Sequence, residues 1–171
     1  MLNKIGLIGG GNIGGVLMQE VAKRRLARSV AMVDIKEPDL AKGKALDIAE
    51  GSPTIESDVE VIGGKTYDVI EGSDLVINTA GVPRTTRPDG TIPTREELLA
   101  TNLKITDLVS EGIQKYCPNA TIVSVANPLD AIVYTLYKFH HVLFFKKLFC
   151  LRIYIRCRCH QEFAVHFPCQ V

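Results

Sequence analysis

The chain has 171 residues and a formal net charge of +1, and this length suffices for one domain with its own hydrophobic core. Residues 1–137 carry a charge balance of −4 and a single Cys, whereas residues 138–171 carry +5 together with all four His and all six Phe. The mildly acidic, Cys-poor body favours a reducing, cytoplasmic compartment and no nucleic-acid partner. No membrane partner is expected, because no run reaches the roughly 18 apolar residues of a bilayer span. No leader is expected before the first strand.

Apolar runs and helical periodicity alternate along the body of the chain. In chain order, the pattern predicts a strand over 4–8, a helix over 12–28, a strand over 29–35, a helix over 39–50, strands over 58–62 and 74–79, a helix over 94–116, a strand over 120–126 and a helix from 129. This alternation indicates an α/β fold of the Rossmann type, a doubly wound parallel sheet with five recognisable strands and helices on both faces. Such a sheet binds ligands at the carboxyl ends of its strands.

Local signals place several boundaries and faces. Gly63-Gly64 is expected to end the third strand, and Thr94 followed by Glu97 has the spacing of a capping box at the start of the third helix. Because no sixth strand is recognised, one edge of the sheet is expected to be open or wrongly covered. The predicted buried side of the first helix consists of Ile13, Val16, Leu17, Val21 and Ala22.

The turn after the first strand has the spacing Gly9, Gly11, Gly14, and Asp34 follows at the end of the second strand. The glycines allow a tight turn, a close approach of a pyrophosphate to the backbone and close packing of the helix, whose N-terminus attracts phosphate. A carboxylate after the second strand binds ribose hydroxyls and disfavours a 2′-phosphate. A structural turn and a surface Asp are the alternatives. The predicted NAD contacts are Gly9, Gly10, Gly11, Asn12, Ile13, Gly14 and Asp34.

The loop after the fourth strand carries Arg84, Arg87 and Arg95. Guanidinium groups bind carboxylates through two parallel hydrogen bonds. A loop of about a dozen residues rich in Gly and Pro can close as a lid that excludes water. These features predict a small anionic substrate, with a solvated basic loop as the alternative.

The motifs and their order resemble the N-terminal half of malate dehydrogenases of the type related to lactate dehydrogenases, over roughly residues 3–137. The further segments that carry the resemblance are Lys44-Ala45-Leu46-Asp47-Ile48, 79–84, 94–102 and 125–130. The resemblance implies NAD as cofactor and hydride transfer between malate and oxaloacetate, a reaction of the tricarboxylic acid cycle and of carboxylic acid metabolism. It also implies that the full-length proteins are homo-oligomers.

The resemblance also implies roles for individual residues. Arg84 corresponds to the arginine that pairs with the far carboxylate of the dicarboxylic substrate, and Arg95 to the one that polarises the keto oxygen when the lid closes. Asn102 and Asn127 correspond to residues that hold cofactor and substrate near the nicotinamide. Val125 and Ala126 complete the predicted cofactor contacts.

One departure from the family concerns the lid. The family usually separates the two loop arginines by six positions, whereas Arg84 and Arg95 are eleven apart, which places five extra residues in the lid. Arg87 is therefore an alternative candidate for pairing with the far carboxylate or for polarising the keto oxygen. A lactate dehydrogenase-like 2-hydroxy acid dehydrogenase is the alternative, because some parasite lactate dehydrogenases also have a lengthened lid.

Residues 138–171 do not resemble the family, and we interpret them as out-of-frame or non-coding translation. The family's proton-relay His stands in a Gly-x-x-His-Gly-Asp setting, which none of the four His has. The chain is therefore expected to be a truncated, inactive fragment without the C-terminal substrate domain, and it is assigned neither a catalytic residue nor a metal ligand. The alternatives are a zinc site, a membrane-lying stretch over 143–156, and a non-catalytic NAD-binding or interaction module. The zinc ligands considered are Cys157, Cys159, His160, His166 and Cys169.

Overall fold

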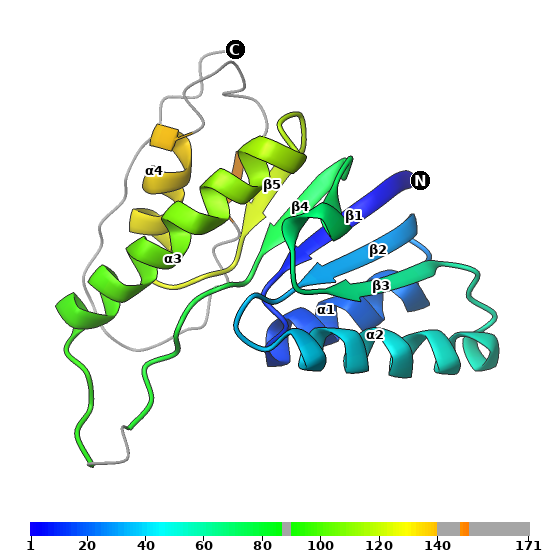
Figure 1. Ribbon diagram of the computed structural model, residues 1–171, viewed down its shortest axis with the longest axis horizontal. Helices are drawn as coiled ribbons and strands as arrows, with labels where there is room; N and C mark the ends of the chain where they lie inside the picture. The colour runs from blue at the N-terminus through cyan, green and yellow to red at the C-terminus, as the bar shows by residue number, and fades with distance from the viewer. Residues whose placement is uncertain (87–89, 140–147, 151–171) are drawn as a thin grey trace.

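The computed structural model describes residues 1–86, 90–139 and 148–150, and in it strands and helices alternate along the chain (Figure 1). The strands are β1 (Leu2–Ile8), β2 (Ala27–Val33), β3 (Glu60–Gly64), β4 (Leu75–Asn78), β5 (Thr121–Ser124) and β6 (Leu148–Cys150). The helices are α1 (Asn12–Lys23), α2 (Pro38–Gly51), α3 (Arg95–Tyr116) and α4 (Leu129–Phe139), with short 3-10 turns η1 (Ser52–Ile55) and η2 (Tyr67–Ile70). The α/β class predicted from the sequence is confirmed.

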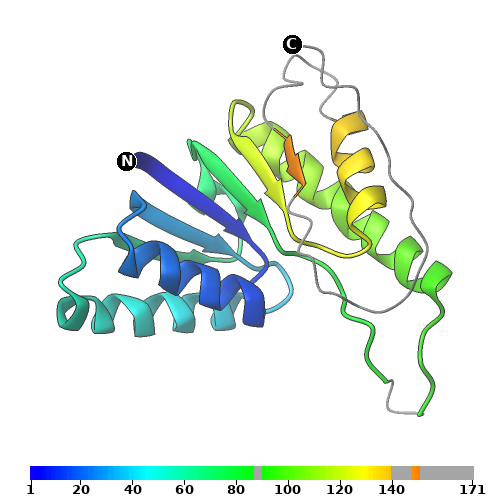
Figure 2. The same cartoon turned by 180° about the vertical axis from the view of Figure 1, so that it is seen from behind.

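All strand pairs are parallel, and the strands lie in the order β3-β2-β1-β4-β5-β6. The chain builds one half outward from β1 to β3 and then returns to the other side of β1 to build the second half. The strand order therefore reverses between β1 and β4, which is the point where doubly wound sheets bind ligands. Helices α1 and α2 cover one face of the sheet, and α3 and α4 cover the other (Figures 1 and 2).

Two hydrophobic clusters, one on each face, hold the layers together. Ile5 and Leu7 of β1 belong to the cluster under α1 and α2, whereas Ile8 belongs to the cluster under α3 and α4. The same alternation occurs in β2, where Met32 faces the first cluster and Val33 the second. Strands buried on both faces explain why their sequences are continuous apolar runs.

Helix α1 differs from the prediction in its end and in its buried face. It ends at Lys23, followed by Arg25 with a φ of 52°, and β2 begins at Ala27. Ile13 and Val16 are 55% and 60% exposed. The buried residues are Gly14, Met18, Val21 and Ala22. Val21 and Ala22 are buried as predicted, and Leu17 packs against the same cluster. Ile13 and Val16 are not buried, because the close contact at Gly14 sets which face of the helix meets the sheet.

The expected end of the third strand is also wrong. Gly63 and Gly64 lie inside β3, and a Cβ at Gly63 would lie 2.3 Å from the carbonyl O of Ala41. Gly63 thus allows α2 to pack closely on the strand instead of ending it. Of the two outcomes expected for the edge of β5, open or wrongly covered, the structure shows a covered edge, because β6 pairs with it from Ile122↔Leu148 to Ser124↔Cys150.

The capping box at the start of α3 is confirmed. The Thr94 side chain accepts a hydrogen bond from the Glu97 backbone N–H, and the Glu97 carboxylate accepts one from the Thr94 N–H. Two otherwise unpaired donors are satisfied, so the helix begins at Arg95. In the part of the chain that the structure describes, no helix is long and apolar enough to span a bilayer.

Candidate functional site

The loops that follow β1 and β4 lie against each other at the reversal of strand order. The Thr79 backbone N–H donates to the Ile8 carbonyl at 2.8 Å, and the Thr79 hydroxyl donates to the same oxygen at 3.0 Å. Ile8 and Asn78 are partners in the β1–β4 register. The glycine turn and the arginine-bearing loop therefore start side by side at one edge of the sheet.

Each motif glycine in the turn has a different structural reason. Gly9 has a φ of 104°, and a Cβ there would lie 2.8 Å from Thr79 Oγ1. A Cβ at Gly14 would lie 2.0 Å from the Gly9 carbonyl O, so α1 cannot approach β1 with any larger residue. At Gly11 a Cβ would meet nothing within 4 Å. The space beside Gly11 is thus open, as the approach of a pyrophosphate requires.

Asp34 is held beside the turn by three backbone donors. Its Oδ2 accepts from the N–H of Gly10 at 2.7 Å, and its Oδ1 accepts from the N–H groups of Lys36 and Glu37 at 2.9 and 2.8 Å. A carboxylate bonded in this way has a fixed orientation at the end of β2. Burial, with a smaller contribution from the negative charge of Asp34, raises the pKa of Tyr67 to about 12. The Tyr67 phenol is therefore neutral near pH 7 and adds no charge beside the carboxylate.

Lys44 of α2 contacts the turn from the other layer. Its Nζ donates to the carbonyl oxygens of Gly10 at 2.7 Å and Gly11 at 2.9 Å. Lys44 lies in a segment that carries the family resemblance, but the sequence suggested no role for it. Only the fold brings it to the turn, 34 positions away from Gly10 along the chain.

Asn102 and Asn127 are brought together, but only one side chain is accessible. Asn102 is 1% exposed, and its Nδ2 donates to the Asn127 carbonyl at 2.6 Å and to the Val82 carbonyl at 3.3 Å. Its Oδ1 accepts from the Val82 N–H at 2.8 Å. The Asn127 side chain is exposed. Asn102 therefore ties the loop after β4 to the loop after β5, while Asn127 presents its amide to solvent.

The remaining predicted cofactor residues, Val125 and Ala126, lie between β5 and Asn127. The Val125 N–H donates to the Asn78 carbonyl at 2.9 Å, which continues the β4–β5 ladder past the end of β5. Ala126 is buried. Val125 thus continues the pairing with β4, and Ala126 lies in the hydrophobic cluster on the side of α3 and α4.

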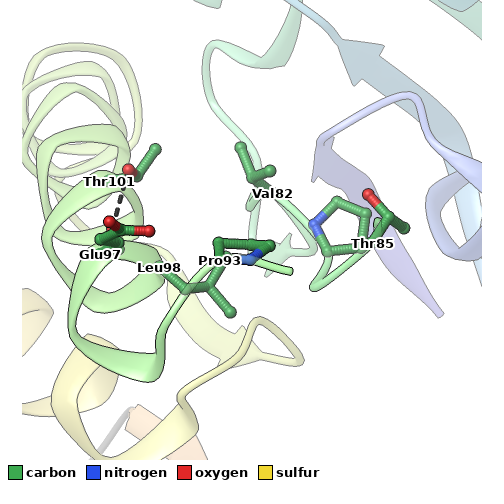
Figure 3. Close-up of a pocket in the computed structure, with 7 residues that line it drawn as sticks. Val82, Thr85, Pro93, Glu97, Leu98 and Thr101 are labelled. Atoms are coloured by element: carbon green, nitrogen blue, oxygen red, sulfur yellow. Dashed lines mark hydrogen bonds between the residues drawn. The ribbon is translucent and has the colours of Figure 1, made fainter. Parts of the chain in front are cut away.

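The arginine-bearing loop leaves the body as an extended excursion between β4 and α3 (Figure 1). Arg84 and Arg95 are both exposed, and Arg84 Nε donates to the Pro93 carbonyl at 3.2 Å across the loop. Arg87 lies outside the described residues. At the base of the loop a cavity of about 130 Å³ opens toward α3 (Figure 3). It is lined by Val82, Pro83, Thr85, Pro93, Glu97, Leu98 and Thr101.

The alternatives considered for the tail fall almost wholly outside the described residues. This applies to the four His, to the proposed zinc ligands and to the membrane-lying stretch, of which the structure describes 148–150 alone. Within residues 1–86, 90–139 and 148–150, no three His, Cys, Asp or Glu side chains form a group that could hold a metal ion.

The residues at the turn fit a dinucleotide. The first amides of α1 have no intrahelical acceptor, and its N-cap is Gly11, which leaves them uncovered by a side-chain cap. The space beside Gly11 at this helix end is open, and the oriented carboxylate of Asp34 is bonded to the neighbouring Gly10. The arrangement offers N–H groups to a pyrophosphate and an acceptor to a ribose.

Comparisons with known proteins find similarity to lactate and malate dehydrogenases. A family model, the NAD-binding domain of lactate/malate dehydrogenase, matches residues 3–146. The malate dehydrogenase of Geotalea uraniireducens is 52% identical over 130 residues, which cover 76% of this chain and 39% of that relative. The chain spans about two fifths of the length of the curated relatives it matches.

Solved structures give the same picture. Malate dehydrogenase from Picrophilus torridus in its apo form superposes with a TM-score of 0.78 at 35% identity, covering 88% of this chain and 46% of that one. Lactate dehydrogenase from Cryptosporidium parvum, complexed with lactic acid and nicotinamide adenine dinucleotide, superposes with a TM-score of 0.73 at 40% identity, covering 84% and 43%.

Proposed function

Because the chain belongs to the lactate/malate dehydrogenase family and carries its NAD-binding domain, we propose that residues 1–137 bind NAD for a malate dehydrogenase-type oxidoreductase. The observation that carries the proposal is the open space beside Gly11 together with the carboxylate of Asp34, fixed by its bond to Gly10. When bound, NAD supplies the hydride acceptor. The chain supplies the surface that orients it.

The contacts to the cofactor follow from the position of each group. The N–H groups of Gly11, Asn12 and Ile13 bind the pyrophosphate, and the tight turn at Gly9 and Gly10 brings it close to the backbone. Asp34 binds the adenosine ribose, and its charge disfavours a 2′-phosphate. Val125, Ala126 and the Asn127 amide line the nicotinamide end. Asn102 shapes that end from beneath.

The substrate is proposed to be a small dicarboxylate, malate or oxaloacetate. Arg84 would pair with the far carboxylate and Arg95 would approach the keto oxygen when the loop closes, because both guanidinium groups are exposed at the two ends of one loop. The eleven-position spacing of these arginines favours a second candidate, a 2-hydroxy monocarboxylate such as lactate. The similarity to the Cryptosporidium lactate dehydrogenase also supports this second candidate.

The 171 residues by themselves are proposed to bind NAD without measurable turnover. Hydride transfer from a hydroxy acid also requires a group that takes up the hydroxyl proton, and no His of this sequence stands in a Gly-x-x-His-Gly-Asp setting. We further propose that the NAD-binding domain ends at residue 137 and that residues 138–171 derive from out-of-frame or non-coding translation. The full-length protein is proposed to be a homo-oligomer in the cytoplasm.

The proposal is tested by titrating the purified full chain with NADH and following the fluorescence of the bound nicotinamide. Saturable binding, with NADH preferred over NADPH, is expected. Absence of saturable binding by correctly folded chain, checked by circular dichroism, would reject the NAD function. Oxaloacetate-dependent oxidation of NADH by chain free of host enzyme would reject the claim of no turnover, and the same assay with pyruvate separates the two substrate candidates.

A further inference from the structure

Two hydrogen bonds join Lys44 to the glycine turn, and both go to the backbone. The ammonium donates to the carbonyl oxygens of Gly10 and Gly11 at 2.7 and 2.9 Å. Hydrogen bonds from a charged donor are roughly twice as strong as neutral ones. Lys44 therefore restrains two successive peptide units in the segment that faces the pyrophosphate.

The direction of these bonds determines where the neighbouring N–H groups point. In a planar trans peptide the N–H points opposite to the C=O. The bond from Lys44 to the Gly10 carbonyl therefore turns the Gly11 N–H away from α2. The Gly11 carbonyl also accepts the Gly15 N–H of α1 at 3.0 Å, so at this peptide Lys44 reinforces the direction of the Asn12 N–H that the helix sets. The Gly10 N–H is already bonded to Asp34 Oδ2 at 2.7 Å. Asp34 thus fixes Gly10 through its N–H, and Lys44 fixes it through its C=O. The next two N–H groups, those of Gly11 and Asn12, remain for a ligand.

Gly15 provides the space that Lys44 occupies. A Cβ at Gly15 would lie 3.0 Å from both Cδ and Nζ of Lys44. Helices α1 and α2 lie side by side on one face of the sheet (Figure 1), so the lysine crosses α1 at this glycine to reach the turn. The Gly-x-Gly-x-x-Gly spacing ends at Gly14 and assigns nothing to Gly15.

We propose that Lys44 is a positioning residue for the dinucleotide, which it serves by orienting the N–H groups of Gly11 and Asn12 toward the pyrophosphate. This inference rests on the proposed NAD function and deepens it. Lys44 acts through the backbone of the turn, and Gly15 leaves the space in which the lysine side chain lies.

The test compares Lys44→Ala with Lys42→Ala. Lys42 is an exposed lysine on the same helix, and its substitution removes the same charge. Lys44→Ala should weaken NADH and ADP-ribose binding about tenfold, because two charge-assisted bonds are lost. Binding of adenosine, which has no phosphate, should not change. Equal losses in the two variants, an equal loss for adenosine, or no loss for NADH in Lys44→Ala would each overturn the proposal.

Salt separates positioning from direct attraction between the ammonium and the phosphates. At about 1 M NaCl the Debye length is about 3 Å, so long-range attraction is screened. A bond that orients the backbone should keep its effect, and the ratio of dissociation constants between Lys44→Ala and the parent chain should remain near its low-salt value. A ratio that falls to one at high salt would overturn the positioning role.

Gly15→Ala gives a second test in which lysine is retained. The new methyl group would lie 3.0 Å from Cδ and Nζ of Lys44, so the lysine must shift slightly and its bonds to the turn must lengthen. NADH binding should weaken by up to about threefold, and the effect should not add to that of Lys44→Ala. The melting temperature should not fall, because Ala forms helix better than Gly. Full additivity in the double variant, or unchanged binding in Gly15→Ala, would contradict the proposal.

Hydrogen exchange of the free chain distinguishes failure of this inference from failure of the NAD function. The amides of Gly9 and Gly10, which are bonded to the Val33 carbonyl and to Asp34, should exchange faster in Lys44→Ala than in Lys42→Ala, with no cofactor present. Unchanged exchange overturns the role of Lys44 even if the parent chain binds NADH. If the parent chain does not bind NADH, the NAD function fails, and since the inference rests on that function, the ligand role of Lys44 fails with it.

Discussion

The side-chain amide of Asn102 donates a 2.6 Å hydrogen bond to the backbone carbonyl of Asn127. This bond crosses from α3 to the loop after β5, and further bonds from the same amide hold Val82 in the loop after β4. Because Asn102 is 1% exposed, its contribution to ligand binding is indirect. It sets the relative position of two loops whose exposed residues would contact cofactor and substrate.

Asn102→Ala should therefore lower stability as well as binding. The substitution leaves the Val82 N–H and the Asn127 carbonyl without their partner, and an unpaired buried polar group costs about 1–3 kcal/mol. Urea denaturation of the two chains measures the difference in the free energy of unfolding. Asn127→Ala is the matched control, because its exposed side chain should change stability by less than about 0.5 kcal/mol. Equal stabilities of Asn102→Ala and the parent chain would contradict the role of Asn102 as a tie.

Gly11→Ala and Gly14→Ala should separate ligand binding from folding. At Gly11 a Cβ meets nothing within 4 Å and φ is −63°, so the free chain should accept alanine at no more than the cost of alanine at an N-cap, less than about 1 kcal/mol. NADH binding should fall about tenfold or more, because the methyl group occupies the space of the pyrophosphate. The two readouts are the melting temperature and the NADH dissociation constant.

At Gly14 the result should be different. A Cβ would lie 2.0 Å from the Gly9 carbonyl O, so α1 must move away from β1, and overpacking of this kind costs about 1–3 kcal/mol. The melting temperature should fall and NADH binding should be lost with it. If Gly11→Ala proved as destabilising as Gly14→Ala, the open space beside Gly11 would not exist in solution.

Asp34→Asn should weaken the discrimination between NADH and NADPH. Asparagine keeps the size of the side chain and one acceptor oxygen, but removes the charge that repels a 2′-phosphate. The NADH dissociation constant should rise about tenfold, since charge-assisted bonds become neutral ones, while NADPH binding should be unchanged or stronger. Asp39→Asn, an exposed acid in the first turn of α2, controls for the loss of one negative charge. An unaltered NADH-to-NADPH ratio would show that Asp34 does not select the cofactor.

The local features of the fold could be predicted because they depend on neighbours in the sequence. The capping box needs only Thr94 and Glu97, three residues apart, and it was placed correctly. The glycine turn and the end of β2 were likewise recognisable from spacing. The prediction was wrong where packing across layers decides. Gly63 continues β3 because α2 approaches it at Ala41, a contact that the sequence does not express.

In the candidate site, too, residues within a local sequence pattern could be predicted, whereas contacts between distant elements could not. Gly9, Gly11 and Asp34 belong to one recognisable pattern, and the structure places them together. Lys44 could not be assigned, because its partners lie more than 30 residues away and are backbone atoms that any sequence has. Burial of the Asn102 side chain was invisible for a similar reason, since α3 buries it against loops from two other strands.

Removal of residues 140–171 should expose the edge of β5. The pairing of β5 with β6 covers positions 122–124, and unpaired strand edges exchange amide hydrogens readily and promote association. A chain that ends after residue 139 should therefore show faster exchange over 121–125 than a chain that ends after residue 150, and it should aggregate at lower concentration. Mass-spectrometric hydrogen exchange measures the first and light scattering the second. Identical protection in the two chains would indicate that β6 does not pair with β5 in solution.

Alkaline pH should destabilise the fold through Tyr67. Burial raises the pKa of this phenol from an ordinary 10.0 to about 12, so between these values the unfolded chain releases a proton that the folded chain retains. A group with a raised folded-state pKa gives its full stabilisation below the unfolded pKa and loses it as the pH rises through the folded one. The free energy of unfolding should consequently fall from pH 10 to pH 12. Tyr67→Phe keeps the ring packed on α3 and removes the titration, so its stability should fall less steeply than that of the parent chain over the same range. Parallel stability curves for the two chains would show that the Tyr67 phenol is as well solvated as in the unfolded state.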